Sequence, residues 1–247
     1  MKTLICALML SATPVMALDL SAMNESEKTA FGAAVRDYLI ENPEILIEVM
    51  NVLEQRHLAE ASANDAALIA RLSDQIYDDG HSWSGGNPDG DVTVVEFIDY
   101  RCGVCQRAFP EVEHILANDS NIRVIFKDLP VLGDESRLAA RFATAVMQLE
   151  GADAYKRVHD HFYQMRGNIT PESLHAIATD MGFDADALIA ALDSDAVTDV
   201  LAANAQLAQQ LQIGGTPSFI IGETILRGLP PTGITPVIAE TRMTEDG

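Results

Sequence analysis

Helical periodicity dominates the first part of the chain. Apolar residues at helical spacing predict an amphipathic helix over 27–41. It should end just before Pro43, because the residue preceding a proline is pushed out of the helical region. A longer helix is predicted to restart at Pro43, which suits a first helical turn. Its apolar stripe slips in register after Leu53. The segment 18–75 is therefore predicted to be a helical leader, either packed on its own domain or acting as an oligomerisation arm.

Strand patterns begin after a loop-like stretch at 78–90 that is rich in glycine and aspartate. Residues 92–100 are mostly β-branched or aromatic and predict a buried strand. A helix is predicted over 104–117 and a second strand over 122–127. Strand, helix and strand at this spacing form a βαβ unit, which implies parallel pairing of the two strands.

The next part of the chain has helical spacing throughout. Five helices are predicted, over 135–149, 152–165, 171–181, 185–192 and 195–212. Strand character then returns at 218–221 and 224–226, before a last short helix at 235–241. The predicted fold class is therefore α/β, with a small sheet interrupted by an all-helical insertion at about 134–212 and preceded by the N-terminal helical extension.

The first 17 residues have the pattern of a secretory signal peptide. Lys2 precedes a short apolar run from Leu4 to Leu10, and small residues lead to Ala17. We expect cleavage after Ala17 and export to the periplasm. The mature chain has no uninterrupted apolar run of about 18 residues, so it is expected to be soluble.

Acidic residues outnumber basic ones by 37 to 16, which gives a formal net charge of −21. This balance disfavours nucleic acid and anionic membranes as partners, because both would be repelled.

The number and spacing of the cysteines indicate a redox-active pair rather than a disulfide that stabilises the fold. Of three cysteines, Cys6 lies in the predicted signal peptide, so the mature chain keeps only Cys102 and Cys105. A bridge between them closes a very short loop and constrains little of the unfolded chain. The start of a helix offers unpaired N–H groups that would stabilise a thiolate on Cys102. Cys105, one turn later, could then resolve a mixed disulfide.

Two other readings of the cysteine pair are weaker. Half of a zinc site would need a second pair of ligands, and no second cysteine pair exists. A purely structural disulfide is the other alternative. A further candidate metal cluster, His159 and His161 with Met165, is disfavoured because positions two apart point to different faces of a helix.

Glu96 lies six residues before Cys102 on a strand that should be buried. A buried acid is costly unless it has a partner or a role. It could accept a proton or tune the pKa near Cys105, or it could pair with Lys127 on the neighbouring strand. The two readings are compatible.

Thr216-Pro217 precedes a predicted strand. A cis bond there would expose the backbone of Thr216 to an extended substrate peptide. Taken alone, the sequence favours an ordinary loop with a trans proline.

Three segments, FIDYRCGVC, FKDLPVLG and GGTPSFIIG, occur in an order and at separations that resemble the DsbA family of thioredoxin-fold proteins. The resemblance covers about residues 76–245. It implies a thioredoxin-like domain over 76–247 that contains the helical insertion.

The resemblance also implies roles for the site residues. Cys102 would be the attacking cysteine, Cys105 the resolving cysteine and Glu96 the buried acid. Pro217 would be a cis proline that holds Thr216 against the cysteine pair, which replaces the trans expectation. Gly-Val between the cysteines and threonine before the proline are more similar to the ScsC branch and to the isomerase DsbC. Some ScsC proteins assemble through N-terminal helices.

The expected function is that of a periplasmic thiol–disulfide oxidoreductase that forms or isomerises disulfides in exported proteins. It would need no cofactor beyond its two cysteines, and a membrane or soluble thiol partner would reset them. A homo-oligomer through residues 18–75 is a further expectation. The rival readings are a periplasmic chaperone and a Cu(I)-binding protein that uses the same two thiols.

Overall fold

The computed structural model describes residues 23–245, so the predicted signal peptide at 1–17 lies outside the described residues. The chain divides into two compact units, one ending at Leu58 and the other beginning at Ala59. No helix within 23–245 combines the length and the apolar character that a membrane span requires.

The N-terminal unit is helical, as the sequence predicted. It contains α1 (Glu25–Glu41) and the first part of α2 (Glu44–Arg71). Asn24 caps α1 by accepting the N–H of Glu27, whose carboxylate accepts the N–H of Asn24 in return, which forms a capping box. No residue of α1 is buried.

The C-terminal unit is built on a five-stranded sheet with the order β1-β3-β2-β4-β5. β2 and β3 are parallel, as the predicted βαβ unit requires, and the other pairs are antiparallel. The strands are β1 (Trp83–Gly86), β2 (Val92–Ile98), β3 (Ile122–Asp128), β4 (Ser218–Ile221) and β5 (Thr224–Arg227).

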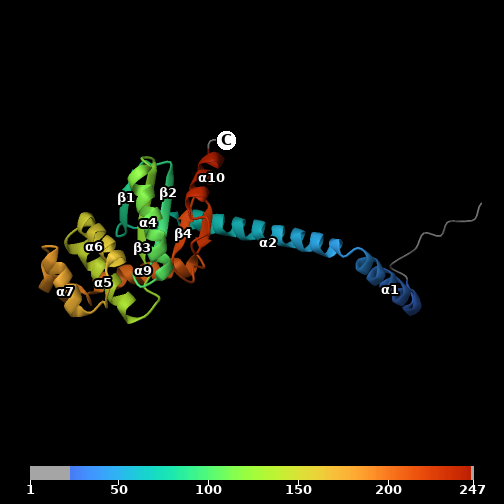
Figure 1. Ribbon diagram of the computed structural model, residues 1–247, viewed down its shortest axis with the longest axis horizontal. Helices are drawn as coiled ribbons and strands as arrows, with labels where there is room; N and C mark the ends of the chain where they lie inside the picture. The colour runs from blue at the N-terminus through green and yellow to red at the C-terminus, as the bar shows by residue number, and fades with distance from the viewer. Residues whose placement is uncertain (1–22, 246–247) are drawn as a thin grey trace, which may run out of the picture. The chain divides into compact units, whose positions relative to one another are not determined.

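Helices cover both faces of this sheet. α4 (Gly103–Asn118) and α10 (Thr235–Glu245) pack on the face that carries Val94 and Ile98, and the end of α2 packs on the face that carries Val95. Five helices connect β3 to β4, and Figure 1 shows α5, α6 and α7 grouped beside the sheet. The remaining helices are α3 (Ser73–Tyr77), α5 (Asp134–Leu149), α6 (Ala152–Gln164), α7 (Pro171–Asp180), α8 (Ala185–Ala191) and α9 (Asp195–Gln210).

The edge strand β1 lies where the sequence predicted a loop at 78–90. Strands are recognised by alternating apolar and polar side chains, and the two glycines of β1 have no side chain to contribute to that pattern. The Trp83 ring stacks on Phe126 with centroids 4.8 Å apart. A Cβ on Gly85 would lie 2.1 Å from the same ring, so the strand needs glycine at that position.

The last turns of the predicted leader belong to the C-terminal unit. Leu68, Leu72 and Ile76 are buried against Val95 and the neighbouring apolar side chains of the sheet. Leu68 and Leu72 lie within the segment 18–75 that the sequence predicts to be the leader, and Ile76 directly follows it.

Candidate functional site

Cys102 is the N-cap residue of α4, directly after the turn that follows β2. Its Sγ accepts the N–H of Cys105 at 3.4 Å, and its own N–H donates to the carbonyl of Asp99. Both cysteines are free thiols. Cys102 is 6% exposed and Cys105 1% exposed. The helix terminus therefore directs an N–H group at the sulfur of the outer cysteine, as the sequence predicted.

The loop before β4 meets the cysteine pair. The bond between Thr216 and Pro217 is cis, in agreement with the family resemblance and not with the loop read alone. The thiol of Cys102 donates to the carbonyl of Thr216 at 3.2 Å. Ser218 stabilises the turn by donating to the carbonyl of Gly215 at 2.8 Å. The threonine backbone is thus held against the outer sulfur.

Asp99 fixes the turn that presents Cys102. One carboxylate oxygen accepts the N–H of Arg101 at 2.8 Å, and the other accepts those of Val131 and Leu132 at 2.8 and 3.1 Å. Asp99 therefore joins the turn that carries Cys102 to the loop after β3. The sequence analysis did not single out this residue, although an aspartate between a buried strand and a tight turn is the relevant signal.

Glu96 is 4% exposed and shares the face of β2 that α4 covers. Burial raises its pKa to about 8, and the negative charges of Cys102 and Glu113 raise it in the same direction. The Cys105 thiol also has a raised pKa, first because of burial and then because of the charge of Glu96. The charge on Glu96 therefore disfavours ionisation of the Cys105 thiol, so the two groups are electrostatically coupled.

The predicted partnership of Glu96 with Lys127 is wrong. In the parallel register Glu96 lies opposite Phe126, and Lys127 lies opposite Phe97. Alternation along a strand therefore sends the lysine to the opposite face of the sheet. There its ammonium donates to Asp79.

Lys127 instead links segments on the far face of the sheet. Besides Asp79, its ammonium donates to the carbonyl of Gln75 at 3.0 Å and to the hydroxyl of Ser82 at 3.3 Å. Burial raises the pKa of Asp79, but the hydrogen bond and charge of Lys127 outweigh it and lower that pKa to about 2. The pair is a structural connection rather than part of the cysteine site.

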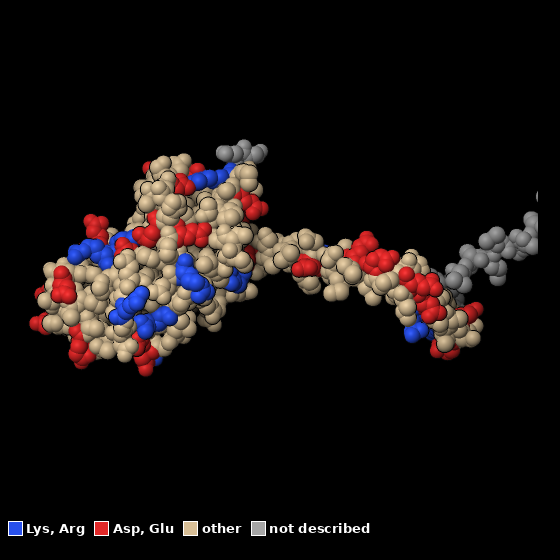
Figure 2. Space-filling view, viewed as in Figure 1, with Lys and Arg blue, Asp and Glu red and all other residues tan. Residues whose placement is uncertain are grey.

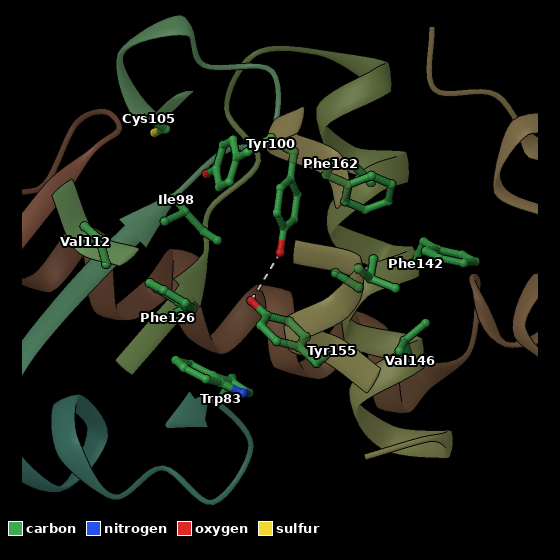
Figure 3. Packing of buried hydrophobic residues seen from close by; sticks show 14 of the residues in the cluster. Trp83, Ile98, Tyr100, Cys105, Val112, Phe126, Phe142, Val146, Tyr155 and Phe162 are labelled. Atoms are coloured by element: carbon green, nitrogen blue, oxygen red, sulfur yellow. Dashed lines mark hydrogen bonds between the residues drawn. The ribbon is translucent and has the colours of Figure 1, made fainter. Parts of the chain in front are cut away.

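A buried polar network lies between the sheet and the helical insertion. Tyr100 donates to the hydroxyl of Tyr155 at 3.2 Å, and Tyr155 donates to Asp128 at 3.1 Å. Figure 3 shows the two tyrosine rings pointing at each other from the end of β2 and from α6. Burial raises the pKa of Asp128 to about 7. Local sequence patterns do not predict this network, since Tyr100 and Tyr155 are 55 positions apart and Asp128 and Tyr155 are 27 apart.

One group of residues in the described part of the chain has metal-ligand types close together, namely Glu113, His159 and Asp160. The Lys156 ammonium lies 2.9 Å from Glu113 and 2.6 Å from Asp160, so a lysine already supplies the positive charge. The His159 ring stacks on Phe126 in the core. His159 is thus a packed aromatic side chain.

Family models match both units of the chain. The model described as the DSBA-like thioredoxin domain matches residues 93–232. The model described as the N-terminal domain of the copper resistance protein ScsC matches residues 27–60.

Solved structures share the architecture. A thioredoxin-like oxidoreductase from Silicibacter pomeroyi is 32% identical, with a TM-score of 0.63, and the match covers 70% of this chain and 98% of that one. Proteus mirabilis ScsC, in a conformation described as transitional, is 28% identical with a TM-score of 0.64. That match covers 92% of this chain and 100% of that one.

Curated relatives match over shorter lengths. The disulfide bond formation protein D of Bacillus subtilis is 24% identical over 152 residues, which are 58% of this chain and 68% of that protein. The Na(+)/H(+) antiporter NhaA 1 of Salinispora arenicola is 29% identical over 136 residues, and the chain spans about a fifth of that protein's length. Since the first family model spans more than half of the chain and the cysteine pair lies within it, the chain belongs to the family of DSBA-like thioredoxin domains.

Proposed function

We propose that this protein is a periplasmic thiol–disulfide oxidoreductase that forms or isomerises disulfides in exported proteins. The observation that carries the proposal is the outer sulfur of Cys102, which lies at a helix N-terminus and in contact with the Thr216 carbonyl. The name of the Bacillus subtilis relative, a disulfide bond formation protein, supports the same class of reaction. The signal-peptide pattern at 1–17 supports export.

The proposed cycle is a sequence of thiol–disulfide exchanges. In the reduced protein, the Cys102 thiolate attacks a substrate disulfide, so a bond forms between Cys102 and one substrate sulfur while the other leaves as a thiolate. In isomerisation, a second substrate thiolate then attacks the mixed disulfide and releases Cys102. In the oxidised protein, a substrate thiolate attacks the Cys102–Cys105 disulfide, and a second substrate thiolate completes the transfer. This transfer leaves the pair as two thiols, so an external redox partner that accepts two electrons, for example through a disulfide of its own, would reset the pair.

Glu96 has a role in the step by which Cys105 attacks the mixed disulfide at Cys102 and releases a substrate that would otherwise stay bound. Cys105 must lose its proton before it can attack the sulfur of Cys102, and burial raises the pKa of that thiol. We propose that Glu96 in its ionised form receives this proton, which is supported by its burial on the same face of the sheet and by the effect of its charge on the Cys105 thiol. The cycle needs no cofactor beyond the two cysteines.

We further propose that residues 18–75 contain an oligomerisation arm. The helices of the N-terminal unit expose large apolar side chains: Phe31, Val35, Tyr38, Ile40, Leu46, Ile47, Val49, Met50, Val52, Leu53 and Leu58. Large apolar side chains exposed in such number mark an interaction surface more often than isolated exposed residues do. A second copy of the same helices would cover it, and several active sites around one substrate would favour isomerisation.

Two assays separate the activities. Refolding of reduced ribonuclease in the presence of the oxidised protein measures disulfide formation, and reactivation of scrambled ribonuclease by the reduced protein measures isomerisation. Cys102→Ser should lower both rates to background. Equal rates for wild type and Cys102→Ser would refute the proposal.

Light scattering on the mature chain tests the arm. The pair Leu46→Glu and Met50→Glu, at positions 51% and 68% exposed, should convert an oligomer to a monomer and reduce isomerisation more than oxidation. Asn51→Glu adds a charge to the same helix and serves as the control. A monomeric wild type would remove this part of the proposal.

Binding of Cu(I) is the second candidate. The model that matches residues 27–60 is named for a copper resistance protein, and two thiols one helical turn apart suit Cu(I). Titration of the reduced protein with Cu(I) against a chelator of known affinity tests it. Binding that Cys102→Ser does not weaken would refute this use of the pair.

A further inference from the structure

The surface around Cys102 carries four exposed arginines in a strongly acidic protein. Arg101 directly precedes the cysteine, and Arg107 lies on the second turn of α4. A helical side chain covers the turn N-terminal to its own Cα, so Arg107 lies over the turn that begins at Cys102. Figure 2 shows basic side chains gathered along the lower edge of the C-terminal unit.

The other two arginines are tied to the same place by hydrogen bonds. Arg101 donates to the carbonyl of Gly167 at 3.2 Å, which brings the loop containing Arg166 beside the active-site turn. Arg101 also pairs with Glu135 at 3.2 Å, in the first turn of α5, two residues before Arg137. We call Arg101, Arg107, Arg137 and Arg166 the arginine rim.

Nearby acids neutralise only half of the arginine rim. Arg101 is paired with Glu135, and Arg137 with Asp134. Arg107 and Arg166 are exposed and have no ion-pair or hydrogen-bond partner among residues 23–245. Asp99 also lies at this end, but it is 2% exposed and its carboxylate accepts backbone N–H groups.

Two exposed apolar side chains adjoin the arginine rim. Val131 is 48% exposed and Leu132 56% exposed, and Asp99 holds the backbone of both beside the turn that carries Cys102. A polypeptide that reaches Cys102 therefore meets both exposed apolar side chains and unpaired positive charge.

We propose that the arginine rim selects polypeptide segments that carry acidic side chains next to the reacting cysteine. The inference rests on the proposed function and names the substrate class of the same site. The acidic surface elsewhere on the protein is screened beyond about 10 Å at an ionic strength of about 0.1 M, so distant acids contribute little to the field at the arginine rim. Each unpaired arginine should raise the rate of exchange with a nearby carboxylate about threefold in this range.

The test uses two cysteine peptides of equal length, each activated as a mixed disulfide with a chromophoric thiol. Glutamates flank the cysteine in one peptide, and lysines flank it in the other. The rate of chromophore release by the reduced, full-length mature protein is divided by the rate with 2-mercaptoethanol, which removes the intrinsic reactivity of each peptide. We expect the normalised rate to favour the glutamate peptide about tenfold at about 0.1 M salt, and the preference to vanish near 1 M, where screening acts within about 3 Å.

Variants assign the preference to the arginine rim. The double change Arg107→Gln with Arg166→Gln should bring the ratio close to one. Arg71→Gln removes the same charge from α2, which covers the other face of the sheet, and should leave the ratio unchanged. Equal normalised rates in the wild type, or a preference that survives the double change, would overturn the inference. Absence of exchange with either peptide would instead refute the proposed function.

Discussion

Replacing Glu96 by glutamine should make the reduced protein more stable at alkaline pH and leave it nearly unchanged near pH 4.5. Glu96 is buried, and its pKa is raised from 4.5 to about 8 by burial and by the charges of Cys102 and Glu113. The folded protein therefore binds the Glu96 proton more tightly than the unfolded chain does. The stability that results is fully present below pH 4.5 and is lost as the pH rises through about 8.

The size of the effect follows from the shift. Each pKa unit corresponds to about 1.4 kcal/mol, so a rise from 4.5 to about 8 amounts to about 5 kcal/mol at most. Glutamine is neutral at every pH and has nearly the same volume, so it does not carry this loss. Domains are stable by about 5–15 kcal/mol, so the difference between the two proteins is large enough to measure.

Urea unfolding in reducing buffer gives the free energy of unfolding of both proteins at several pH values between 4.5 and 8. The advantage of Glu96→Gln should grow by about 1.4 kcal/mol per pH unit. Cys102→Ser should weaken this trend, because the charge of Cys102 contributes to the shift. Glu240→Gln, an exposed residue of α10, is the matched control. A difference that stays constant with pH would refute the reasoning.

Three further changes test other parts of the structure. Asp79→Asn should lower the free energy of unfolding by about 3 kcal/mol at neutral pH, because buried Lys127 loses its carboxylate partner. The difference should shrink as the pH falls from 3.8 to about 2, where Asp79 itself takes up a proton. Urea unfolding at neutral and at acidic pH measures the loss and its pH dependence. A variant as stable as the wild type at neutral pH would contradict the pairing. Gly85→Ala should cost about 1–3 kcal/mol and change the fluorescence of Trp83, which its Cβ would meet; an unchanged spectrum would contradict this. Thr216→Val should raise the free energy of unfolding by about 1 kcal/mol, because the buried Oγ1 has no hydrogen-bond partner within 23–245; a loss of stability would show that the hydroxyl is paired.

Local sequence patterns predicted the elements that carry the site. The β-branched run at 92–100 and the helix after Cys102 were recognisable because burial and periodicity are properties of neighbouring residues. The strand β1 was missed because Gly85 makes room for the Trp83 ring and Gly86 for the Ile122 carbonyl, so neither position contributes to an alternating pattern.

Local patterns cannot predict contacts that depend on strand register or that join distant segments of the chain. One step of register decides that Glu96 lies opposite Phe126 and that Lys127 lies on the other face. Asp65 and Arg227 form an ion pair with two hydrogen bonds although they are 162 positions apart, so no pattern among neighbouring residues predicts it.

The cis proline was predicted only through the family resemblance. The contact from Cys102 to the Thr216 carbonyl spans 114 positions, so the loop read alone gave the opposite answer. The arginine rim could not be predicted from local patterns either, since the loop at Gly167 contacts Arg101 only in the folded chain.

Site-resolved alkylation tests the central claim most directly. The reduced protein is treated briefly with iodoacetamide at mildly acidic pH, and the modified cysteine is identified by mass spectrometry. The account predicts modification at Cys102, whose sulfur receives a helix N–H, and none at Cys105, whose pKa is raised by burial. An inert Cys102, or earlier reaction at Cys105, would contradict it.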